Sequence, residues 1–150
     1  MVDFFDEINE LEYLYLTSVT EPSDNQLIIK IKAATVSNEE EDLFIDEKNL
    51  GPVRAISSDG SGSEYELFFK SYGSYSITNE SFTALNKNDE RIGRLFCVYS
   101  KSNYLDYIRE TTLVNYTYDY NNTLGHYALN CLNHIVDIVS MDEPVIRRIS

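Results

Sequence analysis

The sequence predicts one mainly β domain (α+β possible), in which an antiparallel barrel- or sandwich-like sheet of about eight strands carries one or two short helices. Segments rich in β-branched, aromatic and aliphatic residues recur along the chain, and hairpin-length connections with Gly, Pro, Asn or Asp separate them. The alternation of strand and helix that is typical of a parallel sheet is missing. A chain of 150 residues, 43% of them hydrophobic, is long enough to bury one core. We therefore expect a single domain over residues 1–150.

The first third predicts a short helix and then a β-hairpin. Asp3 can cap the helix, and Phe5 and Ile8 share one helical face. The alternation of Leu27, Ile29 and Ile31 with more polar neighbours indicates a strand. The elements expected here are, in order, a strand over 11–19, a turn over 21–25, a strand over 26–36, a charged loop over 37–42, a short segment over 43–46, a turn over 48–52 and a strand over 53–57.

The middle third predicts a second hairpin and a long polar connection. Its turn lies at Tyr72-Gly73, between the strand segments 64–71 and 74–79. The polar stretch over 81–93 has no clear period and is expected to be largely loop. The segment over 94–100 reads as a strand by its composition.

The last third predicts one helix and two more strands. Ser102 has the position of an N-cap for a helix that extends to Glu110, with Leu105 and Ile108 on one face. The segment over 112–120 reads as a strand. The segment over 126–140 fits either a helix or a strand, and the β-branched residues at 135–139 favour a strand.

The charge of the chain excludes some partners. The formal net charge is −13, and residues 1–50 carry thirteen acidic against three basic residues. Such a negative field repels nucleic-acid phosphates and anionic membranes, so neither is expected as a partner, whereas a basic protein is attracted. An alternative is that the acidity only keeps the protein soluble.

The sequence predicts a cytoplasmic protein. Its N-terminal residues lack a basic segment followed by an apolar one, so no signal peptide is expected. No apolar run approaches the ~20 residues of a membrane span. Cys97 and Cys131 lie in apolar surroundings and are expected to be reduced core thiols.

No catalytic residue, cofactor site or metal site is predicted. On one strand His126 and His134 would lie about 26 Å apart at ~3.3 Å per residue, too far to share an ion. The acidic run over 39–42 lacks the pattern of a calcium-binding loop. Cys97 lies in a segment whose expected burial disfavours the thiolate. The acidic and histidine residues are therefore interpreted as surface and structural groups.

The tyrosines suggest a contact surface. Tyr116, Tyr118 and Tyr120 alternate along the strand expected over 112–120 and would line one of its faces. Tyrosine suits interfaces because it buries a large ring while its hydroxyl stays hydrated. The alternative is that these rings cover the edge of the domain's own core.

The leading hypothesis is an acidic protein-binding module, such as an immunity protein that neutralises a basic toxin, for example a nuclease. This class rests on analogy of charge alone. The carboxylates over 6–12 would steer the partner. The residues expected to bind it are Glu39, Glu40, Glu41, Asp42, Tyr116, Tyr118 and Tyr120.

Two other hypotheses remain open. One is a small-ligand-binding or enzymatic β domain, which requires a concave Tyr- and His-lined site where His126 or His134 meets an acidic residue. The other is a structural protein that self-associates into a homo-oligomer through the tyrosine strand.

Overall fold

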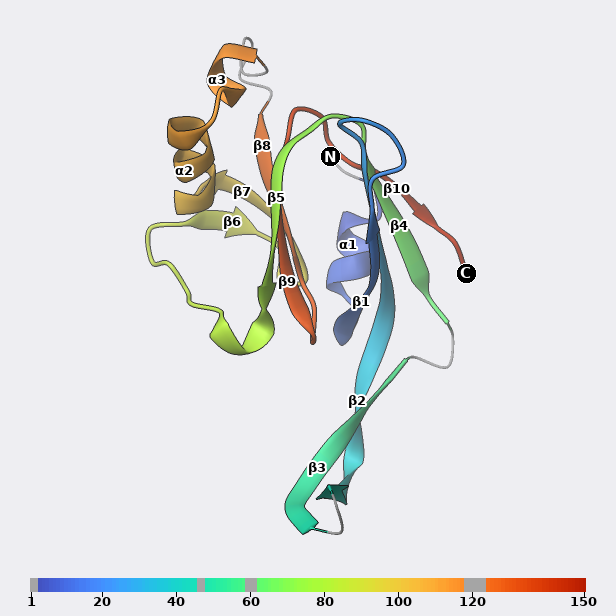
Figure 1. The fold of residues 1–150 in the computed structure, drawn as a ribbon. Helices are drawn as coiled ribbons and strands as arrows, with labels where there is room; N and C mark the ends of the chain where they lie inside the picture. The colour runs from blue at the N-terminus through green and yellow to red at the C-terminus, as the bar shows by residue number, and fades with distance from the viewer. Residues whose placement is uncertain (1–2, 46–47, 59–61, 118–123) are drawn as a thin grey trace.

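Two antiparallel β-sheets pack against each other and enclose the core (Figure 1). The computed structural model describes residues 3–45, 48–58, 62–117 and 124–150, and for 36–58 and 116–117 it describes the backbone alone. The mainly β, sandwich-like class predicted from the sequence is confirmed, with two separate sheets and not a closed barrel. No helix in the described part of the chain combines the length and apolar character needed to cross a membrane.

The first sheet has the order β1-β2-β4-β10, and β3 pairs with the far end of β2. The second sheet (sheet B) has the order β5-β9-β8-β7-β6. Hairpins join β1 to β2, β2 to β3, β6 to β7 and β8 to β9, whereas β4 and β5 lie in different sheets, so the hairpin predicted around Tyr72-Gly73 is wrong. The strands are β1 (Tyr13–Thr20), β2 (Leu27–Ile45), β3 (Lys48–Ser58), β4 (Glu64–Phe69), β5 (Tyr72–Asn79), β6 (Glu90–Ile92), β7 (Phe96–Lys101), β8 (Gly125–Asn130), β9 (His134–Ser140) and β10 (Val145–Arg148).

The helices are short, and two of them were predicted. Helix α1 (Phe5–Asn9) buries Phe5 and Ile8 in the core between the sheets. Helix α2 (Asn103–Thr111) begins after Ser102, whose hydroxyl accepts a hydrogen bond from the Leu105 N–H, so the predicted N-cap is confirmed. The other helical segments are α3 (Val114–Thr117) and the 3-10 turn η1 (Glu80–Phe82).

Alternating side chains of both sheets form the main core. From the first sheet, Leu14, Ile29 and Phe69 point inward, and from sheet B, Phe96 and Ile138 meet them. A second, smaller cluster covers the outer face of sheet B, where α2 and α3 pack with Val139. Sheet B is therefore covered on both faces at one end, and its remaining outer surface is free to form a site.

Other predicted elements are also wrong. Residues 37–42, expected as a loop, belong to strand β2, and residues 48–52, expected as a turn, belong to β3. The two strands pair along these residues, with Glu40 opposite Arg54 and Ile45 opposite Lys48. Residues 114–117 form α3 and not a strand, because a helical turn packs Val114 against α2. The single strand expected over 126–140 is a hairpin of β8 and β9.

The β8–β9 turn also protects an edge of the first sheet. The Asn133 side-chain amide accepts from the Leu16 N–H at 3.0 Å and donates to the Leu16 carbonyl at 3.1 Å. The Leu132 N–H donates to the Leu14 carbonyl at 2.8 Å. Asn133 thus takes the place of a neighbouring strand along β1, which blocks pairing with another chain there.

Both cysteines are free and buried, as the sequence predicted. Burial raises the pKa of the Cys131 thiol from 9.0 to about 12, because the thiolate loses its hydration inside the protein. Because the thiol pKa is higher in the folded than in the unfolded state, this group leaves the free energy of unfolding at its full value below pH 9. That free energy falls as the pH rises from 9 toward 12.

We therefore expect Cys131 to contribute to alkaline destabilisation. Between pH 7 and pH 10 its ionisation in the unfolded chain should remove about 1.4 kcal/mol of unfolding free energy. Urea unfolding of the reduced protein at both pH values, followed by circular dichroism, measures the loss, and Cys131→Ala should lose correspondingly less. An equal pH dependence in both proteins would contradict this assignment.

Candidate functional site

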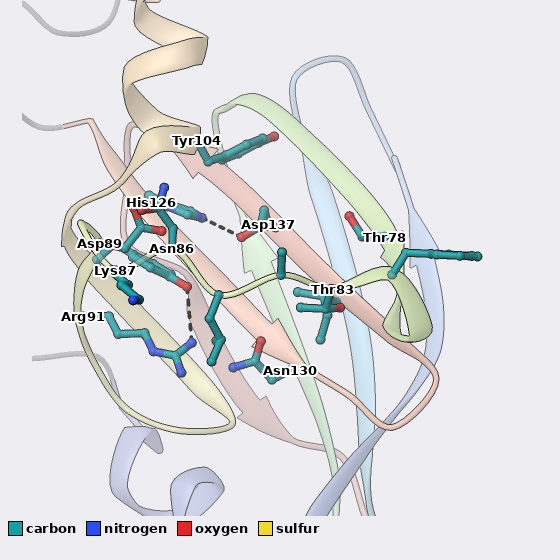
Figure 2. A pocket seen from close by; sticks show the side chains of 15 residues that line it. Thr78, Thr83, Asn86, Lys87, Asp89, Arg91, Tyr104, His126, Asn130 and Asp137 are labelled. Carbon is teal, nitrogen blue, oxygen red and sulfur yellow. Dashed lines mark hydrogen bonds and ion pairs between the residues drawn. The ribbon is translucent and has the colours of Figure 1, made fainter.

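A pocket of about 560 Å³ opens on the outer face of sheet B, between the sheet and the segment over 82–89 (Figure 2). Its floor consists of side chains from β5, β7, β8 and β9, and Tyr104 of α2 and Arg91 of β6 complete its walls. The floor residues are Thr78, Tyr99, His126, Asn130, Ile135 and Asp137.

A row of stacked side chains crosses the floor of the pocket. Tyr99 and His126 are paired across β7 and β8, and their rings stack with centres 4.1 Å apart at an interplanar angle of 8°. The Arg91 guanidinium lies 6.0 Å from the Tyr99 ring centre, and its Nη1 donates to the Tyr99 hydroxyl at 3.3 Å. Desolvation is the main cause that raises the pKa of Tyr99, so this phenol stays protonated and neutral.

The His126 ring is only 2% exposed and has a hydrogen-bond partner at each nitrogen. Its Nδ1 lies 2.7 Å from the Ser102 hydroxyl oxygen and its Nε2 lies 2.8 Å from Asp137 Oδ1. The Ser102 oxygen already accepts from the Leu105 N–H, so its own proton is available for Nδ1. The network therefore assigns the proton of a neutral ring to Nε2, from which it is donated to Asp137.

Ser102, His126 and Asp137 include the residue types of a hydrolytic triad, but their geometry does not suit nucleophilic catalysis. Ser102 is 1% exposed and caps α2, so its hydroxyl cannot reach a substrate in the pocket. His126 and Asp137 both line the pocket, and the Asp137 side chain, 21% exposed, is the more accessible of the two. Ser102 and His126 instead hold the Asp137 carboxylate in a fixed position.

The described residues among those predicted to bind a partner lie in two separate parts of the fold. Glu39, Glu40, Glu41 and Asp42 lie in the arm that β2 and β3 extend beyond the sandwich. Tyr116 lies in α3, at the opposite end of the molecule from that arm (Figure 1). Tyr118 and Tyr120 lie outside the described residues.

The pocket has the contact that the small-ligand hypothesis requires, because His126 meets the acidic Asp137 in a concave site. The second histidine, His134, lies at the start of β9, and its buried Nδ1 has no hydrogen-bond partner in the described structure.

Asp137 was not singled out from the sequence. Its signal is a lone carboxylate inside the apolar run over 135–139, which indicates an acid on the open face of a strand.

Among the described residues, no group of three or more His, Cys, Asp or Glu side chains is arranged to hold a metal ion. The pocket presents hydroxyl groups, aromatic rings and charged side chains.

Comparisons of the chain with models of known protein families, with curated proteins and with solved structures find no match.

Proposed function

We propose that the chain is a protein-binding module whose partner docks over the pocket on sheet B. The observation that carries this proposal is the exposure of two large apolar side chains at the pocket wall. Phe82 is 79% exposed and Leu85 is 88% exposed, and both line the pocket. Apolar side chains that protrude beside a concave polar site are typical of protein interfaces.

The partner that fits this surface is a basic protein. The net charge of −13 attracts a cationic protein over long range and repels nucleic acids. An inhibitor of a basic toxin, in the manner of an immunity protein, has these requirements: rapid steering by charge and tight contact through apolar anchors. We place this function in the cytoplasm, which suits a protein with two free, buried thiols.

The proposal is tested by affinity capture from the native lysate at about 50 and 500 mM salt, because steering by charge weakens as salt screens it. Wild type is compared with the double variant Phe82→Ser/Leu85→Ser. The control is Val145→Ser, which removes a similarly exposed apolar side chain (67% exposed) from β10 in the other sheet.

We expect wild type and Val145→Ser to capture a basic protein at low salt. With the captured protein purified, the double variant should bind at least ten times more weakly, since each apolar anchor of an interface contributes roughly 1–3 kcal/mol. Capture that the double variant does not change would contradict the proposed face. Recovery of the chain itself alone would favour self-association.

A second candidate function is the binding of a small ligand. The pocket volume of about 560 Å³ lies in the usual range for small-molecule sites, roughly 300–1,000 Å³, and its floor joins Tyr99 and His126 with Asp137. A small molecule would fill the pocket but leave Phe82 and Leu85 in water. For this reason we place the protein partner first.

A further inference from the structure

We propose that the pocket receives a guanidinium or ammonium side chain of the partner, with the Asp137 carboxylate as its acceptor. This inference rests on the proposed function and adds the chemistry of the contact. It depends on how Asp137 is held, on the state of the other charges of the pocket and on the aromatic ring beside it.

Asp137 is held in place and has unused hydrogen-bonding capacity. A carboxylate offers about four acceptor positions, and the hydrogen bond found for it in the described structure is the one from His126 Nε2 to Oδ1. The side chain is largely withdrawn from water, with 21% of its surface exposed, on the floor of the pocket. A carboxylate that is partly desolvated favours a donor that carries a positive charge.

The support behind Asp137 keeps this charge available. Ser102 orients His126, and His126 Nε2 contacts Oδ1 of the carboxylate, which leaves Oδ2 open to a ligand. Both supporting residues are buried, so neither has to be ordered when a ligand binds. Such preorganisation lowers the entropic cost of the contact.

The other charged side chains of the pocket lie away from Asp137. Figure 2 shows Lys87, Asp89 and Arg91 together at one side, with Asp137 nearer the middle of the floor. Arg91 donates to the Tyr99 hydroxyl, and Asp89 accepts from the Asn103 N–H at 2.9 Å. Asp89 also interacts electrostatically with Arg91, and Asp137 carries the negative charge nearer the middle of the pocket floor (Figure 2).

Tyr104 supplies an aromatic wall beside His126, the residue that holds the carboxylate. Its ring centre lies 5.0 Å from that of His126, and its hydroxyl lies 3.4 Å from Ser74 Oγ. A planar guanidinium that donates to Asp137 would lie beside this ring, where a cation is attracted to aromatic faces. Arginine, with five donors in a plane, fits this combination better than lysine does.

The first test uses isolated probes and the unaltered protein. N-acetyl-L-arginine amide and N-acetyl-L-glutamate amide are titrated separately, and the His126 imidazole and backbone amide signals are followed by nuclear magnetic resonance. We expect the arginine probe to bind with a dissociation constant in the millimolar range, roughly what one charge-assisted contact supplies. Preferential binding of the glutamate probe, or no shift with either, would overturn the inference.

The second test removes the charge and keeps the shape. Asp137→Asn retains an oxygen that can accept from His126. A urea unfolding midpoint equal to that of wild type will show that the variant folds. We expect this variant to bind the arginine probe and the captured partner at least ten times more weakly than wild type does. Glu110→Gln, which removes an exposed charge of α2 outside the pocket, should change neither by more than about twofold.

The outcomes separate this inference from the proposed function. If the captured partner needs Phe82 and Leu85 but binds equally to Asp137→Asn, the function stands and the cation contact is wrong. If the arginine probe binds through Asp137 but no protein partner is captured, the pocket chemistry stands and the proposed function is wrong.

Discussion

Replacing Gly93 with alanine is expected to destabilise the protein by more than about 3 kcal/mol, a large loss for the addition of one methyl group. Gly93 has a φ of 92°, a backbone conformation that disfavours residues with a Cβ atom. An added Cβ would lie 1.9 Å from the Phe96 carbonyl oxygen and 3.0 Å from the Phe5 ring. The backbone of the β6–β7 loop must therefore move for the variant to fold.

Gly62→Ala provides the matched control. Gly62 also has a positive φ, 66°, but no atom lies within 4 Å of the added Cβ. Gly62→Ala should therefore lower the free energy of unfolding by only about 1 kcal/mol, the cost of a left-handed conformation for a residue with a Cβ atom. Urea unfolding followed by far-ultraviolet circular dichroism measures both variants. Equal losses would mean that the close contact with Phe96 does not determine the effect.

The Gly93 loop also matters for the candidate site. It joins β6, which carries Arg91, to β7, which carries Tyr99, and these two side chains meet at the edge of the pocket. A displaced loop would separate the guanidinium from the phenol. Gly93→Ala should consequently alter the pocket even where enough stability remains for folding.

The fold was predictable from sequence wherever the signal is local. The alternation in β2 up to Ala34 and the N-cap at Ser102 depend on residues a few positions apart, and both were identified correctly. The acidic residues over 39–42 were assigned to a loop by their polarity. Their strand conformation depends on β3, because antiparallel pairing satisfies the hydrogen bonds of the backbone whatever the side chains are.

The C-terminal half shows why patterns of apolar residues mislead. The alternating tyrosines over 116–120 predicted a strand, whereas residues 114–117 form the helical turn of α3, in which Val114 packs on α2. The turn between β8 and β9 contains no Gly or Pro, and Asn133 alone is a weaker turn signal, so the reversal within 126–140 was missed. Asn133 stabilises that reversal through a contact with Leu16, 117 positions away.

The candidate site follows from that same reversal. The hairpin places His126 opposite Val139, with Asp137 two positions along β9 on the same face. In a single strand over 126–140, the eleven positions between His126 and Asp137 would place the two side chains far apart in space. The site was therefore not predictable without the turn, although each residue type in it was visible.

Replacing Asn9 with alanine is expected to cost about 3–5 kcal/mol, because one side chain satisfies the backbone of the whole Gly93 loop. Asn9 Oδ1 accepts from the N–H groups of Arg94, Leu95 and Phe96 at 2.8, 2.8 and 3.1 Å. Its Nδ2 donates to the carbonyls of Phe5 and Phe96 at 3.0 and 2.9 Å. Each partly buried donor left without a partner costs roughly 1–3 kcal/mol.

Asn103→Ala, at an exposed position in the first turn of α2, should change the unfolding free energy by less than about 0.5 kcal/mol. Asn9→Asp separates the two roles of the amide, since it keeps the acceptor for three N–H groups and loses the donor to two carbonyls. If acceptance dominates, Asn9→Asp should retain more than half of the stability that Asn9→Ala loses. Because Asn9 and Gly93 act on the same loop, the double variant Asn9→Ala/Gly93→Ala should lose less than the sum of the single losses; simple additivity would show that α1 and the loop are held independently.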